Sequence, residues 1–337
     1  MASLTGAASL VTSASVSFSV TLLCLRWWVE AARRVKLVGR DMNKLEPREV
    51  PEAGGVWVAI GLSFGVLTLI AMRRYLEGSS DSESYMALAL LLLLAGFLGF
   101  LDDILGWKRG LRAWQRVAFT APLAIPLVVI KAGTSVIDLP LAGPTDLGLL
   151  YPLAAVPLGV VGASNAFNMI AGYNGLEAGM GLLLCVFLAA FSLVKGLELP
   201  LVGSILAASS LAAFLLYNRY PARVFPGNSL TYGFGAYYAS LVILGNLEKF
   251  GLALFSLYFV ELALFLRGLA NGVYKENFGI PRPDGSLDPP YDKIYSLTHA
   301  ALVALRRLRG RATERGVVAF ILSLQAVVGA LALLTLT

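Results

Sequence analysis

Two adjacent carboxylates, Asp102 and Asp103, directly follow the apolar run Tyr85–Leu101. Unpaired carboxylates are costly near hydrocarbon, so such a pair at the end of a membrane helix indicates a cation, a proton relay or a substrate that needs them. A solvated helix cap is the simpler alternative. Four bases follow within one short loop: Lys108, Arg109, Arg112 and Arg116. Because carboxylates hold cations or accept protons and bases hold phosphate oxygens, the cluster is suited to chemistry on a phosphate ester, unless the charges only neutralise one another.

Three asparagines stand among glycines in the segment GASNAFNMIAGYNGLEAGMG, residues 162–181: Asn165, Asn168 and Asn174. Asn165 and Asn168 are three residues apart and would share a helix face. Amide groups offer neutral oxygen ligands to Mg²⁺, and both donors and acceptors to the edge of a nucleobase. Helix packing through amides is the alternative. Glu177, in the same segment, is expected to face the protein interior.

Three further loops carry polar clusters. The first, GRDMNKLEPREVPEAGG (39–55), contains Arg40, Asp41, Asn43, Lys44 and Glu52, although an ordinary basic loop would also fit. In the second (218–236), Phe225 is suited to stack on a planar base and Asn228 to supply an oxygen ligand, although a lone Phe is more often packed or lipid-facing. The third (274–299) is rich in Pro and Gly and is interpreted as a loop that covers a substrate or sets specificity, with partial disorder as the alternative. Residues 297–311 predict a basic surface helix.

The elements that must position these groups are membrane helices. The 337 residues are 57% hydrophobic and 14% charged, with a mean hydropathy of +0.74, whereas soluble domains carry roughly a quarter charged residues. The sequence therefore predicts an all-α polytopic membrane protein with one domain over residues 1–337. Ten apolar segments, the first a retained helix over 6–28, begin near Gly6, Gly54, Ser84, Gln115, Gly148, Leu176, Pro200, Leu230, Phe250 and Gly316.

Lys and Arg are divided unequally between alternate loops. The loops after the odd-numbered segments hold 22 of the 27 bases, so the positive-inside rule places them in the cytoplasm and both termini outside. The predicted cytoplasmic loops are about 29–53, 102–115, 164–175, 218–229 and 268–315. A net charge of +6 concentrated there suits anionic lipid or a phosphorylated substrate, and no nucleic-acid motif accompanies it.

Several common chemistries lack their residues. Cys24 and Cys185 lie within predicted spans and are interpreted as packing residues rather than a disulfide. The single His299 cannot form a metal cluster alone. The sequence has no P-loop, dinucleotide-binding fingerprint or zinc-ligand spacing.

The polar motifs, in this order, resemble the polyprenyl-phosphate N-acetylhexosamine-1-phosphate transferases, and most of all the archaeal and eukaryotic branch that uses UDP-GlcNAc and dolichyl phosphate. The likeness is carried by GRDMNK with VPEAGG, LDDILG, NAFNMIAGYNGLEAG and YPARVFPGNSLTYGFGA, spread over residues 39–236. It implies attack by a lipid phosphate on the β-phosphorus of UDP-GlcNAc, which releases UMP and leaves GlcNAc-diphospho-lipid, the first step of assembling lipid-linked oligosaccharides for N-glycosylation. Mg²⁺, or Mn²⁺ in its place, is the implied cofactor.

The resemblance also implies roles for individual residues. Asn168 and Asn228 would bind the metal, and Asp102, Asp103, Lys44 and Arg116 would form the catalytic set. Arg116, Asn165 and Asn168 would bind the lipid phosphate along the stretch 161–169. The nucleotide sugar would contact Arg40, Asp41, Met42, Glu52, Asn174 and Phe225, with Lys275, Asn277 and Arg282 as substitutes by proximity. Whether an aspartate deprotonates the lipid phosphate, attacks phosphorus or only orders Lys44 and the metal stays open.

Three departures from the family pattern stand out. Asn228 replaces an expected Asp, which removes a negative charge from the metal site. Arg116 replaces a phosphate-binding Lys and presents a planar fork instead of a point charge. An Arg-His-Arg cluster that contacts the sugar nucleotide in the eukaryotic enzymes has no counterpart in the last loop.

Other interpretations remain. A bacterial-type enzyme that loads undecaprenyl phosphate for cell-wall or surface polysaccharide is one, and a secondary transporter is a more distant one, because transporter sites lie near the bilayer midplane rather than at helix ends. The predicted partners are UDP-GlcNAc, polyprenyl or dolichyl phosphate and membrane lipid, with a homodimer possible and no nucleic acid. The predicted location is the plasma membrane in a prokaryote or the endoplasmic reticulum membrane in a eukaryote, with the catalytic face cytoplasmic.

Overall fold

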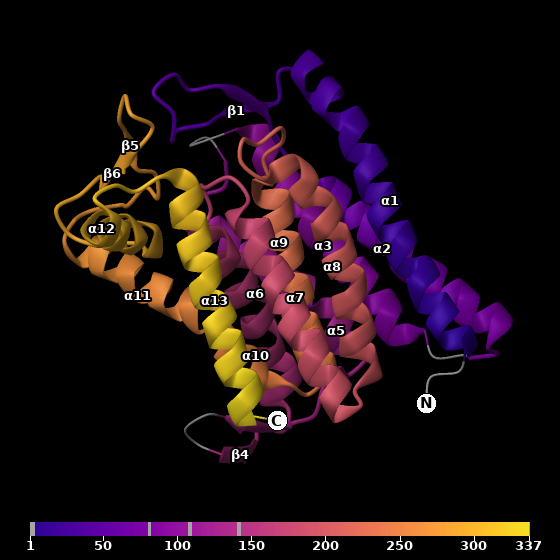
Figure 1. Cartoon of the computed structure of the whole chain (residues 1–337). Helices are drawn as coiled ribbons and strands as arrows, with labels where there is room; N and C mark the ends of the chain where they lie inside the picture. Colours follow the sequence, from indigo (N-terminus) through magenta and orange to yellow (C-terminus); the bar gives the residue numbers. More distant parts are fainter. Residues whose placement is uncertain (1–3, 80–81, 107–109, 140–142, 337) are drawn as a thin grey trace.

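The computed structural model describes residues 4–79, 82–106, 110–139 and 143–336 and is a bundle of helices (Figure 1). Its α-helices are α1 (Leu4–Arg34), α2 (Gly55–Leu76), α3 (Glu83–Leu105), α4 (Ala113–Thr120), α5 (Ile125–Val129), α6 (Val156–Met169), α7 (Leu176–Lys195), α8 (Glu198–Asn218), α9 (Gly227–Leu244), α10 (Glu248–Leu254), α11 (Ser256–Ala270), α12 (Leu297–Arg309) and α13 (Glu314–Leu336). Two short turns, η1 (Ala121–Ala124) and η2 (Tyr151–Ala155), precede α5 and α6. Each of the ten predicted segments begins within three residues of a helix or helical turn.

The predicted class, an all-helical polytopic membrane protein, is confirmed. Among the described residues, six helices are long and apolar enough to cross a bilayer: α1, α2, α3, α7, α8 and α13. Helices α10 and α11 make a seventh candidate if they are counted as one span, bent by 58°. Residues 114–129, around α4 and α5, form a shorter apolar helix. Length and composition therefore support six or seven of the ten predicted spans.

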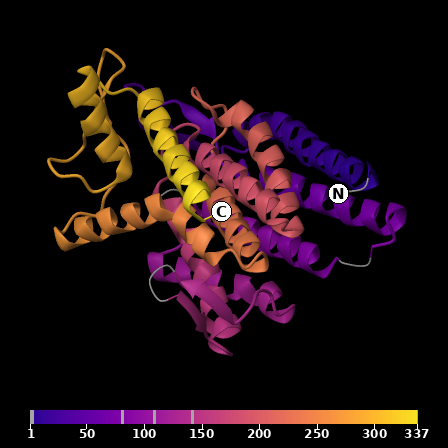
Figure 2. The ribbon, with the colours of Figure 1, turned by 60° about the horizontal axis from the view of Figure 1, so that its bottom comes forward.

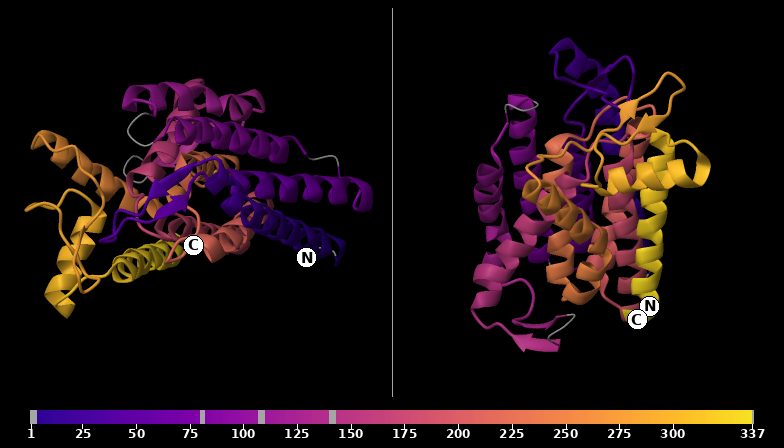
Figure 3. Two further views of the ribbon diagram at one scale, coloured as in Figure 1. Left: turned by 90° about the horizontal axis from the view of Figure 1, so that it is seen from above. Right: turned by 90° about the vertical axis from the view of Figure 1, so that its left-hand side faces the viewer.

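Among the described residues, three short antiparallel strand pairs lie in the loops and mark the two ends of the bundle. Strands β1 (Val38–Arg40) and β2 (Glu49–Pro51) pair within the first loop, and β5 (Ile280–Pro281) and β6 (Leu287–Asp288) pair within the last. Both pairs lie at the upper end in Figure 1, whereas β3 (Val136–Leu139) and β4 (Gly143–Asp146) lie at the lower end. Figure 3 shows both chain termini at the lower end too.

Helix α9 is the centre of the bundle, and every residue from Ser229 to Ile243 is buried. It packs mainly against α3 and α6. The contact with α3 is close because Gly99 has no side chain: a Cβ there would lie 2.2 Å from the carbonyl oxygen of Asn228. Larger residues at position 99 would push the first turn of α9 away from α3.

Helix α11 leaves the bundle at its side and carries α12 with it (Figure 2). The bend is packed by aromatic rings. Phe255, at the junction with α10, stacks on Tyr258 at 4.2 Å and on Tyr238 of α9 at 5.2 Å, and Tyr258 stacks on Phe167 of α6 at 5.1 Å. The predicted surface helix is confirmed as α12, which buries Leu297, Ala301, Leu302 and Leu305 and ends in exposed arginines. Cys24 and Cys185 are both free, as expected.

Candidate active site

The polar motifs meet at the upper end of the bundle, where α3, α6 and α9 end or begin beneath the β1–β2 and β5–β6 hairpins (Figure 1). Asp102 and Asp103 occupy the last turn of α3, Asn168 the last turn of α6 and Asn228 the first turn of α9. Residues from segments more than 100 positions apart are thus brought to one place.

Asp103 caps the amino terminus of α9. One carboxylate oxygen accepts the backbone N–H of Asn228 at 2.6 Å, and the other accepts that of Ser229 at 3.1 Å. The first N–H groups of a helix have no partner within the helix and attract negative charge, so this contact satisfies both groups. Gly227 makes room for it, because its φ is +66° and a Cβ would lie 2.3 Å from the carboxylate. Asp103 therefore fixes the position of Asn228.

Asp102 points to the other side of the same turn and holds the 110–116 segment. Its Oδ1 accepts the backbone N–H of Leu111 at 2.6 Å, and its Oδ2 accepts the hydroxyl of Tyr232 at 3.0 Å. The guanidinium of Arg116 lies 3.6 Å away and donates to the carbonyl of Leu111 at 2.9 Å. Both carboxylates of the pair are buried and hydrogen-bonded, so neither is the solvated cap that was the simpler alternative.

Asn168 and Asn228 face each other. The side-chain NH₂ of Asn168 donates to the side-chain oxygen of Asn228 at 2.7 Å. If the amide of Asn168 turned by half a rotation, two oxygens would stand at that separation, close to the ~3 Å between adjacent ligands in an octahedron with bonds of about 2.1 Å. The two amides could then offer neutral oxygens to Mg²⁺, and their role as metal ligands stays a prediction.

The described residues contain no group of three or more His, Cys, Asp or Glu side chains arranged for a metal. The predicted metal ligands are the two neutral amides, and their binding of Mg²⁺ stays a prediction. Mg²⁺ typically keeps several waters and takes few protein ligands where it binds a substrate phosphate.

Asn165 lies one turn before Asn168 but makes different contacts. Its NH₂ donates to the carbonyl of Val161 at 2.8 Å and to the hydroxyl of Thr120 at 3.3 Å, which joins α6 to the end of α4. These are packing contacts of the kind considered as the alternative. Its role at the lipid phosphate stays a prediction.

Asp41 brings the first loop to Asn174. Its carboxylate accepts the side-chain NH₂ of Asn174 at 3.0 Å and lies 3.2 Å from the ammonium of Lys44. Burial lowers the pKa of Lys44, but the carboxylates of Glu314 and Asp41 outweigh it, so the pKa lies above its usual value and the side chain is charged. Met42, which lies between Asp41 and Lys44 in the sequence, is half-buried. Arg40 is exposed at the end of β1.

Glu52 and Phe225 join the first loop to the segment before α9. The backbone N–H of Phe225 donates to the carbonyl of Pro51 at 2.7 Å, and Gly54 donates back to the carbonyl of Phe225 at 2.9 Å. The side chains of Phe225 and Glu52 are both half-buried. Loss of hydration raises the pKa of Glu52 to about 7.

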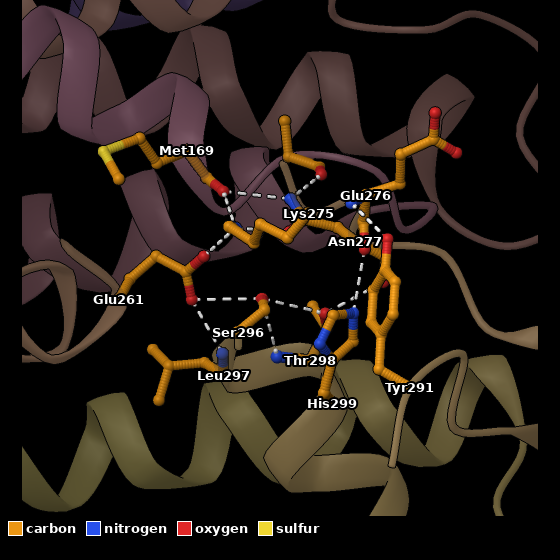
Figure 4. A network of polar contacts seen from close by, with 11 residues as sticks. Met169, Glu261, Lys275, Glu276, Asn277, Tyr291, Ser296, Leu297, Thr298 and His299 are labelled. Atoms are coloured by element: carbon orange, nitrogen blue, oxygen red, sulfur yellow. Dashed lines mark hydrogen bonds and ion pairs between the residues drawn. The ribbon is translucent and has the colours of Figure 1, made fainter. Parts of the chain in front are cut away.

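Lys275 and Asn277 form hydrogen bonds with backbone carbonyls at the end of α6 (Figure 4). Lys275 donates to the carbonyl of Met169 at 3.0 Å, and Asn277 donates to the carbonyls of Met169 and Ala171 at 2.9 and 2.6 Å. Burial lowers the pKa of Lys275 even though Glu261, which is fully buried, forms an ion pair with it. Both predicted donor-contacting side chains are engaged with the protein, and their contact with a nucleotide sugar stays a prediction.

The same network fixes the start of α12. The second oxygen of Glu261 accepts the hydroxyl of Ser296 at 3.1 Å and the backbone N–H of Leu297 at 2.7 Å, as Figure 4 shows. His299 contacts the carbonyl of Glu276 at 2.8 Å. Burial lowers the pKa of His299 to about 4, so it is neutral and serves the packing of the loop.

Arg282 lies on the β5–β6 hairpin, where its exposed guanidinium pairs with Asp288. It borders a cavity of about 470 Å³ whose other lining residues include Lys44, Tyr220, Glu314 and Arg315. Lys44, predicted as a catalytic residue, and Arg282, predicted as a nucleotide-sugar contact, therefore line one cavity from different loops.

Three residues of this region were not predicted: Tyr232, Glu261 and Glu314. Each is a polar residue within an apolar helix, which is the one sequence signal that could have found them, since such groups are costly unless they are paired. Tyr232 and Glu314 pair with Asp102 and Lys44, which lie 130 and 270 positions away in the sequence. Glu261 pairs with Lys275, 14 positions further on and beyond the end of α11. The pairing itself required the fold.

An all-helical membrane bundle with amides, acids and bases gathered at one end defines the class, and comparison with known proteins defines the family. Residues 85–246 match glycosyl transferase family 4. A protein of Saccharolobus solfataricus with the provisional name UDP-N-acetylglucosamine–dolichyl-phosphate N-acetylglucosaminephosphotransferase is 32% identical over 324 residues, which cover 96% of this chain and 95% of its own. A protein of the same name from Sulfolobus acidocaldarius is 33% identical over 293 residues, 86% of each chain.

A more distant relative is the phospho-N-acetylmuramoyl-pentapeptide-transferase of Heliobacterium modesticaldum, which is 31% identical over 251 residues, 69% of this chain and 74% of its own. The chain belongs to glycosyl transferase family 4. The resemblance seen in its motifs is thereby confirmed, and the first two relatives match 96% and 86% of the chain.

The raised pKa of Glu52 predicts a pH dependence of stability. The folded-state pKa of about 7 lies above the ordinary 4.5, so the folded protein keeps a proton that the unfolded chain releases. The contribution of Glu52 is fully present below about pH 4.5, is lost as pH rises to about 7, and is absent above that. Thermal unfolding in detergent at pH 5 and pH 8 should show a smaller pH effect for Glu52→Gln than for the parent. Equal pH effects in the two proteins would contradict the assignment.

The buried ion pair predicts an unequal response to two lysine substitutions. Lys275→Met should destabilise the protein by about 3–5 kcal/mol, because it leaves the carboxylate of Glu261 buried without a counter-charge. Lys275→Met combined with Glu261→Gln should recover most of that loss. Lys249→Met is the matched control: its pair with Asp138 is exposed, so its loss should be below about 1 kcal/mol. Equal losses for Lys275→Met and Lys249→Met, measured by thermal unfolding, would contradict this account.

Proposed function

We propose that this protein transfers GlcNAc-1-phosphate from UDP-GlcNAc to a polyprenyl phosphate of the dolichyl type. The observation that carries the proposal is the amide pair Asn168–Asn228, fixed by Asp103 at the helix ends where acids, bases and the first loop meet. The names of the two archaeal relatives, which match nearly the whole chain, support the same substrates.

In the proposed reaction an oxygen of the lipid phosphate attacks the β-phosphorus of UDP-GlcNAc. A new P–O bond joins the lipid phosphate to GlcNAc-1-phosphate, and the bond to the α-phosphate breaks with its electron pair leaving on UMP. Because the second pKa of a phosphate monoester is about 6, the lipid phosphate is largely ionised at neutral pH and needs no strong base. Catalysis then consists mainly of positioning and of offsetting negative charge.

The protein's own groups divide that work. Arg116, oriented by Asp102, offers a guanidinium where a lipid phosphate can approach the end of α6. Asn168 and Asn228 would hold Mg²⁺, which when bound neutralises the diphosphate and the leaving UMP. Asn174, Asp41 and Phe225 would contact the nucleotide sugar, as the resemblance to the family implies.

Both aspartates act by ordering other groups in this proposal. Each oxygen of Asp103 accepts a backbone N–H, and Asp102 accepts from Leu111 and Tyr232 while facing Arg116. A carboxylate with both oxygens engaged in this way is poorly prepared to attack phosphorus. Direct attack by the lipid phosphate follows.

The site is proposed to face the cytoplasm. The end of the bundle that carries β1, β2, β5 and β6 also carries most of the Lys and Arg residues, which favours the cytoplasmic side. Ten crossings are proposed, with the segments of α4–α5, α6 and α9 completing the apolar helices. An even number of crossings agrees with both termini at one end (Figure 3).

The alternative acceptor is undecaprenyl phosphate, as in a bacterial-type enzyme. The similarity to the Heliobacterium protein favours keeping it. The groups that bind the nucleotide sugar would be the same with either lipid. The lipid acceptor and the sugar donor must therefore be tested separately.

The proposal is tested with the purified full-length protein, Mg²⁺, UDP-[¹⁴C]GlcNAc and dolichyl or undecaprenyl phosphate. Labelled lipid and an equal amount of UMP are expected, with no exchange of UMP into the donor when lipid is omitted.

Asp103→Asn should lower kcat at least about a hundredfold, since it weakens the cap that places Asn228. In sealed vesicles, externally added donor should react only where the β5–β6 end faces outward. Absence of lipid product with every UDP-HexNAc and both lipids would refute the proposed transferase activity.

If the neutral side chain of Asn228 binds Mg²⁺, the Mg²⁺ concentration needed for activity should depend on the charge at this position. Asn228→Asp should lower the Mg²⁺ concentration for half-maximal activity several-fold, because it adds a negative charge next to the ion. Asn218→Asp is a control, since Asn218 is buried but binds the carbonyl of Val224 outside the amide pair. An unchanged Mg²⁺ requirement in Asn228→Asp would show that Asn228 does not touch the ion.

A further inference from the structure

Glu314, the first residue of α13, joins two predicted functional groups that lie far from it in the sequence. It is 4% exposed. Its Oε1 accepts the backbone N–H of Asn174 at 2.9 Å, and its Oε2 pairs with the ammonium of Lys44. One carboxylate therefore binds both the segment between α6 and α7 and the first loop.

Asp41 completes the arrangement from the opposite side. It binds the side chain of Asn174 at 3.0 Å and lies 3.2 Å from Lys44, so Asn174 is held by its backbone through Glu314 and by its side chain through Asp41. Lys44 lies between the two carboxylates. Removing either carboxylate frees one of the two attachments of Asn174.

This cluster lies beside further cationic side chains and borders a cavity. The ring of Tyr220 is contacted by Lys44 at 4.5 Å and by Arg315 at 4.6 Å. Lys44, Tyr220, Glu314 and Arg315, with Arg282 across from them, line the cavity of about 470 Å³. Glu314 is thus the acid that sets where Lys44 stands at the edge of a space large enough for a sugar phosphate.

Packing alone does not require an acid here. Helix α13 is attached to the bundle by apolar contacts with α7 and α10, and its buried residues include Val317, Ile321 and Ala332. A buried carboxylate is costly unless it is fully paired, and the partners of Glu314 are both on loops rather than on helices. The contact therefore orders loops more than it holds helices together.

We propose that Glu314 is a positioning residue for the nucleotide sugar, which holds Asn174 and Lys44 in the arrangement that binds the donor. The inference rests on the proposed function and adds a residue to its donor side. Glu314 acts through Asn174 and Lys44 and does not itself meet the reacting atoms.

The proposal predicts a split between the two substrates. Glu314→Gln keeps an oxygen that can accept the N–H of Asn174 but loses the charge that holds Lys44. The KM for UDP-GlcNAc and the dissociation constant measured by calorimetry without lipid should both rise about tenfold, the loss expected for one charged hydrogen bond. The KM for the lipid phosphate should stay within about twofold, because neither Asn174 nor Lys44 is assigned to that substrate. Glu314→Ala should weaken donor binding further.

Glu198→Gln is the matched control. Glu198 pairs with Arg73 between α8 and α2 and is 69% exposed in its side chain, so its loss should leave both KM values unchanged. If Glu314→Gln does not fold, Glu314→Asp keeps the charge but cannot reach both partners, and a weaker donor affinity is still expected.

Folded Glu314→Gln or Glu314→Asp with unchanged or tighter donor binding would overturn the proposal, as would equal losses for donor and lipid. If the parent protein binds UDP-GlcNAc and makes product but the variants behave like it, only the role of Glu314 fails. If the parent protein does not bind UDP-GlcNAc, the proposed function fails instead.

Discussion

The contact between the carboxylate of Asp103 and the first turn of α9 is the constraint on which the site depends. It joins the end of α3 to the start of the most buried helix and places Asn228 opposite Asn168. It requires Gly227, whose positive φ and missing side chain leave room for the carboxylate. A carboxylate at a helix amino terminus is favoured by the unpaired N–H groups and the helix dipole. The buried carboxylate and the unpaired N–H groups, each costly alone, therefore stabilise each other.

Three other acids near the site follow the same rule, since each is paired with a group from another segment. Asp102 binds Leu111 and Tyr232, Glu261 binds Lys275, and Glu314 binds Lys44 and Asn174. Glu177 accepts the N–H of Gly172 with one oxygen, and its other oxygen has no hydrogen-bond partner among the residues that the structure describes. The loops are therefore ordered by charge and hydrogen bonds, while the bundle beneath them is held by apolar and aromatic packing.

Much of this could be read from residue types and spacing. The apolar segments, the helical class and the gathering of basic loops at one end follow from hydropathy and charge, because the bilayer imposes length and composition directly. The position of Asp102 and Asp103 at a helix end was equally visible. The family followed from motifs, whereas the roles of Lys275 and Asn277, whose side chains hold the carbonyls behind Asn168, were beyond reach of the sequence. Those bonds join residues over 100 positions apart.

The sequence by itself determined that this protein is a helical membrane protein of glycosyl transferase family 4 with its polar residues at helix ends. Only the tertiary structure decided which carboxylate meets which partner: Asp103 the backbone of α9, Asp102 the segment of Arg116, and Glu314 the first loop. The physical reason is that hydropathy and helix periodicity act on near neighbours in the chain, whereas a buried charge is stabilised by whichever group the fold brings within hydrogen-bond distance.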